Sequence, residues 1–263
     1  MNTKTRQAGN LPARPFMAKT MDTKNCRKNL TSGMNPPDRG PASVPLPECP
    51  RTASPVPWLT SIHATPGRGD YGDPAYRGNC SGLLIRDLLR FYGSRRCLDP
   101  MEGGGTCRDV CRELGVEYVG RDLKSGFDAS RAELYRGLGK FDFIWLHPPY
   151  WNMVRYNADD GRCLSSAPCV PEFVTQLRRV LRNCRGVLAE GGKLAVLMGD
   201  GKHEGHYLGL PFRTLNAAAA EGYWLAAPEI IRFSHGATSS GRTYRTAFIP
   251  RLHDVCLVLE SRR

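Results

Sequence analysis

The stretch that most constrains this chain is a short apolar run ended by two consecutive prolines. Phe143-Ile144-Trp145-Leu146 is long enough for one buried strand, and Pro148-Pro149 can continue neither a strand nor a helix. His147 to Tyr150 are therefore expected at the carboxyl end of a strand, the edge where ligands bind in open α/β sheets. There they present an imidazole, a carbonyl that no neighbouring amide easily claims, and an aromatic face. This set suits a flat heterocycle that carries an amine.

A glycine-rich turn follows another predicted strand. After residues 96–99 the chain reads Pro100-Met101-Glu102-Gly103-Gly104-Gly105-Thr106, and a helix through Leu114 comes next. Consecutive glycines allow positive φ angles and let a ligand approach the backbone closely. A phosphate-binding loop would need a lysine after the last glycine, and Thr106-Cys107 supplies none. The turn therefore argues against a nucleoside triphosphatase.

An acidic residue follows at a characteristic distance. Asp122 ends the predicted strand 117–122 and lies 23 residues after Asp99. In dinucleotide- and adenosyl-binding sheets, the carboxylate at this distance accepts hydrogen bonds from two ribose hydroxyls. The glycines, Asp122 and the Pro-Pro-Tyr stretch occur in one order with helix-sized gaps, which predicts neighbouring strand ends that share one site.

These motifs together resemble those of the amino-methyltransferases that modify adenine N6 or cytosine N4 in DNA. Residues 147–150 are similar to the family's Asp/Asn/Ser-Pro-Pro-aromatic loop, although His147 departs from it. Residues 99–106 are similar to its Asp-Pro-Phe-x-Gly-Ser-Gly-Thr motif, with Met101 and Gly104 as mild departures. The resemblance covers about residues 78–260. It implies S-adenosylmethionine as cofactor and an α/β fold: a Rossmann-like, seven-stranded, mostly parallel sheet with one antiparallel edge strand and helices on both faces.

The resemblance also implies the site residues. The implied cofactor contacts are Asn79, Ser81, Asp99, Pro100, Gly103, Gly105, Thr106, Asp122, Phe127 and Asp128, and the implied catalytic residues are His147, Pro148, Pro149 and Tyr150. The His147 side chain and the Pro148 carbonyl would bind the hydrogens of the target amine as charge develops. Tyr150 would stack on a base that has left the DNA duplex.

An imidazole can accept a hydrogen bond only when it is neutral. With an unperturbed pKa of about 6.5 for His147, the catalytic rate is expected to fall as the pH drops through about 6 to 7.

Charge favours a nucleic-acid partner. The formal net charge is +12, and residues 1–57 hold ten of the twenty prolines and nine Lys or Arg. We expect residues 1–57 to be a disordered tail, 58–77 a lead-in segment, and 78–263 the catalytic domain. Trp151, Arg242, Arg245 and Arg251 are candidate nucleic-acid contacts, the arginines as phosphate ligands.

The ten cysteines include no Cys-x-x-Cys pair, although Cys107 and Cys111 share a helix face. We expect free thiols in a reducing cytosol, no metal and a cytoplasmic protein. No stretch reaches the roughly 20 apolar residues that span a bilayer, so no membrane association is expected.

The remaining pattern completes the expected sheet. It predicts helices over 81–92, 170–190 and 207–221, strands over 192–198, 224–233 and 254–260, and a polar loop over 151–169. We favour adenine N6 over cytosine N4 as the target. Two alternatives stay open: an RNA base methyltransferase, and a non-catalytic nucleic-acid-binding partner subunit.

Overall fold

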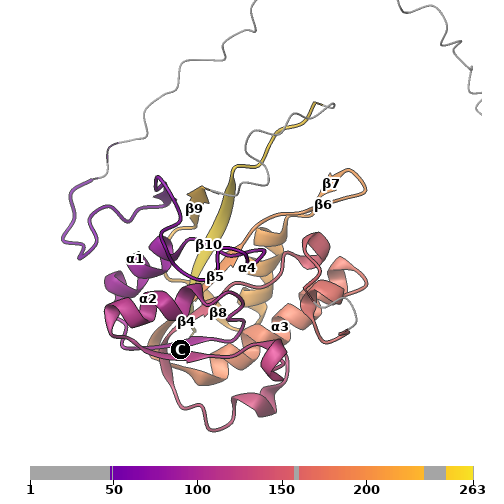
Figure 1. Ribbon diagram of the computed structural model, residues 1–263, viewed down its shortest axis with the longest axis horizontal. Helices are drawn as coiled ribbons and strands as arrows, with labels where there is room; N and C mark the ends of the chain where they lie inside the picture. The colour runs from indigo at the N-terminus through magenta and orange to yellow at the C-terminus, as the bar shows by residue number, and fades with distance from the viewer. Residues whose placement is uncertain (1–47, 49, 157–159, 234–246, 263) are drawn as a thin grey trace, which may run out of the picture. The chain divides into compact units, whose positions relative to one another are not determined.

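The computed structural model describes residues 48, 50–156, 160–233 and 247–262, and residues 49–263 form one compact unit. In the described part, a central sheet carries α1 and α2 on one face and α3 and α4 on the other (Figure 1). These helices span Gly82–Tyr92, Thr106–Leu114, Val170–Val187 and Leu210–Ala220. No helix in the described residues is long and apolar enough to cross a membrane. The predicted Rossmann-like class, a mostly parallel sheet between helices, is confirmed.

The strands of this sheet run in the order β1-β9-β10-β5-β4-β2-β3, and β8 also pairs with β10. Their bounds are β1 Ile62–His63, β2 Arg96–Asp99, β3 Glu117–Gly120, β4 Phe141–Leu146, β5 Leu188–Met198, β8 Tyr223–Leu225, β9 Ile230–Phe233 and β10 His253–Ser261. A separate hairpin consists of β6 Lys202–His203 and β7 His206–Tyr207.

The central strands are apolar on both faces. In β4, Ile144 and Leu146 pack into the core on the α3 and α4 side, whereas Phe143 and Trp145 pack into the core on the α1 and α2 side. A parallel strand covered on both faces reads as a continuous apolar run, which is why this stretch stands out in the sequence. Only the ends of such strands are open to a ligand.

The antiparallel strand lies inside the sheet, which corrects the prediction of an antiparallel edge strand. β10 pairs antiparallel with β5 on one side and with both β9 and β8 on the other. The strand predicted over 224–233 is therefore two strands, interrupted near Pro228, since a proline cannot donate to a ladder. β1 then pairs parallel with β9 and forms the edge.

The strand β1 comes from the lead-in segment, where the sequence predicted no element. The segment is fixed to α1 by two hydrogen bonds to Asp87 Oδ2: Trp58 Nε1 donates over 3.0 Å, and His63 Nε2 lies 3.2 Å away. A two-residue strand is too short to show a periodic pattern in the sequence. Its formation depends on pairing with the distant strand β9.

Other stretches also differ from the prediction. Residues 188–190, predicted as the end of a helix, form the start of β5. The stretch 151–169 contains the 3-10 helices η3 (Trp151–Met153) and η4 (Leu164–Ser166), and both helices bury side chains. In addition, α4 starts at Leu210 rather than at 207, because Asp200 accepts hydrogen bonds from the backbone N–H groups of Gly209 and Leu210.

The order in which successive strands join the sheet reverses between β2 and β4, although both strands run in the same direction. β2 pairs parallel with β3 on one side and with β4 on the other. The chain therefore continues from β2 to β3 on one side and then crosses to β4 on the other side of β2. Ligands bind outside the carboxyl ends of strands at such a switch point. The turn after Asp99 and the turn after Leu146 both start there.

Candidate active site

The glycine turn between β2 and α2 forms one wall of the site. Gly103 and Gly105 have φ angles of 54° and 78°, in the left-handed region that favours glycine. A Cβ atom on Gly104 would lie 3.0 Å from the Tyr76 side chain. The absence of side chains therefore lets an aromatic ring lie directly against this backbone.

Asp122 is oriented by the same turn. Its Oδ2 accepts a hydrogen bond from the Gly103 N–H over 3.0 Å, and its Oδ1 accepts one from the Lys124 N–H over 2.9 Å. A carboxylate has about four acceptor positions, so each oxygen retains capacity for a further donor. The two fixed oxygens can therefore accept hydrogen bonds from a pair of neighbouring hydroxyl groups.

A cleft that is partly open to solvent brings the two ends of the site together. Its lining contains nine of the predicted site residues: Asn79, Pro100, Gly103, Thr106, Asp122, Phe127, Asp128, His147 and Pro149. Residues from four separate stretches of the sequence thus share one cavity at the switch point. Predicted site residues outside this lining are Ser81, Asp99, Gly105, Pro148 and Tyr150.

Ser81 and Asp99 are buried beneath the cleft rather than exposed in it. Ser81 Oγ donates to the Arg68 carbonyl over 3.4 Å, and Asp99 Oδ1 accepts from the Met101 N–H over 3.1 Å. Burial raises the pKa of Asp99 well above its usual range, and the nearby acids Glu102 and Asp122 add to this rise. The predicted direct cofactor contacts of Ser81 and Asp99 do not agree with these positions, since Ser81 binds the backbone of the lead-in segment and Asp99 binds the backbone of the turn.

Two tyrosines that the sequence did not indicate line the cleft. The rings of Tyr76 and Tyr156 stack with centroids 5.8 Å apart, and Lys124 Nζ lies 4.6 Å from the Tyr76 ring centroid. One tyrosine lies in the lead-in segment and the other in the stretch expected to be a polar loop. Neither lies in a motif, and only a fold can bring them together.

The imidazole of His147 contacts the hydroxyl of Tyr150. Their Nε2 and Oη atoms are 3.0 Å apart. In the neutral imidazole one ring nitrogen donates and the other accepts. If Nε2–H donates to the Tyr150 oxygen, Nδ1 keeps its lone pair for another donor. The Tyr150 hydroxyl thus holds the His147 ring through Nε2, a contact different from the predicted stacking on a base.

A buried ion pair lies next to Tyr150. Arg232 of β9 and Asp254 of β10 are in contact, and their side chains are 8% and 7% exposed. A Cβ atom on Gly199 would overlap both the Tyr150 ring and the Asp254 carboxylate. The ring and the ion pair therefore pack against the same piece of backbone at the end of β5.

This environment keeps His147 neutral. Burial lowers the pKa of His147 to about 4, although the negative charge of Asp254 opposes this shift; the positive charge of Arg232 adds to it. Burial also raises the pKa of Tyr150 well above its usual range, so its hydroxyl keeps its proton. The expected titration of His147 between pH 6 and 7 is therefore wrong, because burial cannot be read from this part of the sequence.

Of the four residues predicted to contact nucleic acid, the structure describes Trp151 and Arg251. Trp151 is only 4% exposed and its indole N–H donates to the Ala167 carbonyl over 2.9 Å, which does not agree with a contact to nucleic acid. Arg251 Nη2 lies 3.9 Å from Asp254 Oδ1. Arg242 and Arg245 lie outside the described residues.

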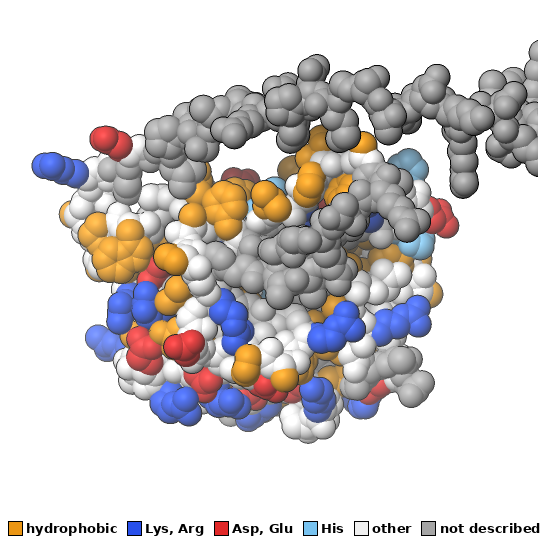
Figure 2. Space-filling view, turned by 45° about the horizontal axis from the view of Figure 1, so that its top comes forward, with side chains coloured by type: hydrophobic (Ala, Val, Ile, Leu, Met, Phe, Trp, Pro, Cys, Tyr) orange, Lys and Arg blue, Asp and Glu red, His pale blue; other side chains and the backbone are white. Residues whose placement is uncertain are grey.

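Among the described residues, the basic side chains on the face that Figure 2 shows do not gather in one patch. Lys and Arg side chains are spread around the lower rim of this face, with Asp and Glu beside them. Part of the positive charge is also paired: Arg178 and Arg182 both contact Glu221, with N···O distances of 2.8 Å. The net charge of the chain therefore does not by itself locate a binding surface.

The chain has structural likenesses to several solved proteins. No protein-family model matches it, and no curated protein matches its sequence. TrmN from Thermus thermophilus is 17% identical, with 70% of this chain and 50% of that chain covered and a TM-score of 0.40. The "Putative DNA Modification Methylase" TTHA0409, also from Thermus thermophilus, is 19% identical, with 52% of each chain covered and a TM-score of 0.38.

A third structure, a SAM dependent methyltransferase from Archaeoglobus fulgidus, is 14% identical, with 70% of this chain and 96% of that chain covered and a TM-score of 0.42. This chain thus spans about half the length of the first two proteins. At these identities and scores, the likenesses carry no argument about what this chain does.

We predict that Arg232→Ala lowers the free energy of unfolding by about 3–5 kcal/mol, because it leaves the buried Asp254 carboxylate with only the more distant Arg251, 3.9 Å away. Thermal and urea unfolding monitored by circular dichroism would measure this loss. The double variant Arg232→Met, Asp254→Leu should lose much less, because it removes both charges of the buried pair together.

The matched control is Arg131→Ala, which breaks the exposed pair with Glu133 and should leave the free energy of unfolding nearly unchanged. Equal losses for Arg232→Ala and Arg131→Ala would show that the buried pair does not stabilise the fold.

Proposed function

We propose that this chain is an S-adenosylmethionine-dependent methyltransferase that acts on the exocyclic amine of a base in DNA, with adenine N6 favoured over cytosine N4. The observation that carries the proposal is the shared cleft: the glycine turn and Asp122 line the same cavity as His147 and Pro149. Cofactor-type and amine-binding groups thus lie within one site at the switch point between β2 and β4.

The residues of the cleft fit this cofactor. Asp122 offers two oriented oxygens to the hydroxyls of a ribose, and Phe127 offers an apolar side chain to a purine ring. Asp128 uses Oδ1 to accept from the backbone N–H and hydroxyl of Ser130, which fixes its carboxylate toward an exocyclic amine. When bound, the cofactor supplies an electrophilic methyl group, so the chain itself needs no covalent nucleophile.

The chain's own residues prepare the amine. The lone pair of an exocyclic base amine is delocalised into the ring, so two acceptors that bind its hydrogens draw it toward tetrahedral geometry. We assign these roles to Nδ1 of His147 and to the carbonyl of Pro148. With a pKa of about 4, His147 accepts a hydrogen bond without taking the proton, which goes to solvent after transfer.

The proposed catalytic domain includes the lead-in segment. Tyr76 lies against the glycine turn, and Trp58 and His63 anchor the segment to α1 through Asp87. We therefore place the start of the domain before residue 78, at about residue 58. Arg242, Arg245 and Arg251 remain proposed phosphate contacts, and a base flipped from double-stranded DNA remains the proposed substrate.

The test of the function is mass spectrometry of nucleosides from DNA and RNA of cells that express the chain. Methylated adenine in DNA, absent with His147→Ala, is the expected result. Methylcytosine in DNA would change the base assignment, and modification of RNA alone would replace the proposed substrate. If the purified chain binds S-adenosylmethionine but modifies neither nucleic acid, the non-catalytic alternative is the better description.

We predict that Asp122→Ala weakens S-adenosylmethionine binding by about 1.5–3 kcal/mol, the range for hydrogen bonds to a charged group. Isothermal titration calorimetry would measure the affinity. Asp122→Asn keeps one acceptor oxygen and should lose less. Glu133→Gln, at an exposed acid away from the cleft, should bind like the wild type. An unchanged affinity for Asp122→Ala with a normal melting curve would remove Asp122 from the site.

We predict that the methylation rate of the wild type stays level from about pH 7 to pH 5 and falls only near pH 4. His147 loses its acceptor when it is protonated, and its pKa is about 4. His147→Asn should remain active without this acid limb, since an amide oxygen accepts at all these pH values. His147→Ala should lose about a hundredfold or more in rate. Single-turnover assays across a pH series would measure these rates.

Cofactor affinity serves as the control, because none of these substitutions touches the proposed cofactor contacts. Tyr150→Phe should lower the rate with unchanged cofactor affinity, because it removes the hydroxyl that holds the His147 ring through Nε2. An acid limb at pH 6 to 7 in the wild type would mean that His147 is not neutralised by its surroundings.

A further inference from the structure

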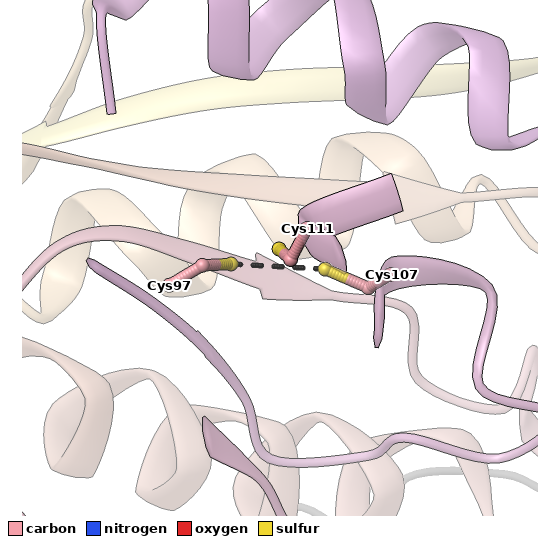
Figure 3. A group of neighbouring side chains, drawn as sticks. All are labelled: Cys97, Cys107 and Cys111. Carbon is pink, nitrogen blue, oxygen red and sulfur yellow. Dashed lines mark hydrogen bonds between the residues drawn. The ribbon is translucent and has the colours of Figure 1, made fainter. Parts of the chain in front are cut away.

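Three cysteine side chains converge in the core beneath α2. Cys97 comes from β2, and Cys107 and Cys111 come from α2 (Figure 3). Their sulfur atoms all lie within 4.8 Å of one another, and those of Cys97 and Cys107 are 3.7 Å apart. The three residues are 0–1% exposed. The sequence did not indicate this cluster, because Cys97 is too far from Cys107 and Cys111 in the sequence to form a Cys-x-x-Cys motif with either of them.

Local structure explains why the sulfurs meet. Residues four apart on a helix lie on the same face, which directs Cys107 and Cys111 together toward the sheet. Alternation along β2 places Cys97 on the α1 and α2 side, whereas Leu98 packs on the opposite side. The rigid crossing of a helix over a strand therefore holds all three sulfurs in place before any ligand binds.

The spacing fits metal coordination. With metal–sulfur bonds of about 2.3 Å, two sulfurs on one ion lie about 3.8 Å apart in tetrahedral geometry and about 4.0 Å apart in a trigonal plane. The 3.7 Å between Cys97 and Cys107 is close to both values, and the 4.8 Å limit on the others requires only small side-chain adjustments. Among the described residues, no other His, Cys, Asp or Glu atom belongs to the group.

We propose that Cys97, Cys107 and Cys111 form a three-sulfur binding site for a soft monovalent ion, copper(I). Thiolates select soft ions such as copper(I) and zinc. Structural zinc sites are almost always four-coordinate, and the fully buried group offers three sulfurs and no solvent position for a fourth ligand. Copper(I) accepts three sulfur ligands, so the geometry favours it over zinc.

Binding requires no redox step. Each sulfur–metal bond that replaces an S–H bond releases one proton to solvent, and copper enters and stays as the monovalent ion. Two thiolates and one thiol around the ion leave a net charge of −1. Cys107 lies in the first turn of α2, where the helix dipole stabilises negative charge.

Two other descriptions of the cluster make different predictions. Buried cysteines often pack as small apolar side chains, in which case the site would bind no ion. A disulfide between Cys97 and Cys107 would require the sulfurs to move from 3.7 Å to about 2.05 Å, and an oxidant. Cys184 provides a matched comparison, since it is equally buried but packs alone in the core on the α3 side.

The experiment is an anaerobic titration of the reduced full chain with copper(I) held by a colorimetric chelator of known affinity. We expect the wild type to take one equivalent from the chelator and to melt at a higher temperature with it. Cys97→Ala and Cys111→Ala should each weaken binding at least tenfold, whereas Cys184→Ala should bind like the wild type. X-ray absorption of the loaded wild type should show three sulfur ligands, which needs no variant to fold.

Several outcomes would overturn the proposal. Copper(I) left entirely on the chelator would leave simple core packing as the description. Equal affinity in the wild type and in the triple alanine variant, or a spectrum with nitrogen or oxygen ligands, would place copper elsewhere. Zinc(II) bound more tightly than copper(I), with a fourth ligand, would overturn the assignment of the ion. None of these readouts depends on methyltransferase activity.

Discussion

Parallel pairing of β2 with β4 is the constraint on which the rest of the site depends. Both strands are covered by helices on both faces, so their carboxyl ends are the positions open to a ligand. Because the chain continues to β3 on one side of β2 and to β4 on the other, the glycine turn and the His147 turn face the same space. The cleft follows from strand order more than from any single residue, and the chain adds chemistry only in the turns.

The sequence indicated the parts of the site that are local and failed for the parts that depend on distant packing. The glycine turn, the Asp122 spacing and the proline pair are patterns within a few residues, and the structure puts them in one cleft. Tyr76 and Tyr156 stack although 80 residues separate them, so no local pattern could pair them. β10 lies inside the sheet because β8 and β9 both pair with it on the side away from β5. The periodicity of the sequence cannot specify this pairing.

His147 shows how burial changes the chemistry that a residue type suggests. In water an imidazole titrates near neutral pH, and the sequence alone gives that value. In the structure, burial lowers the pKa of His147 to about 4, against the opposing charge of Asp254. A carboxylate at this position would be an acceptor at neutral pH but would carry a negative charge into a buried site, which costs free energy unless it is paired. A neutral imidazole accepts the same hydrogen without that cost, which gives the departure at His147 a physical rationale within the proposed mechanism.

The buried pair of Arg232 and Asp254 is consistent with a role for Tyr150 as well. Replacing a buried ion pair by apolar residues is often neutral or stabilising, so stability alone does not explain its presence. Here the pair and the Tyr150 ring pack on Gly199, where any side chain would overlap both of them. The two charges of the pair act on the pKa of His147 in opposite directions, since Asp254 raises it and Arg232 lowers it, and Tyr150 contacts the imidazole directly. β9 and β10 thereby act on a turn at the end of β4 that they do not pair with, and the interior antiparallel strand becomes part of the site's chemistry.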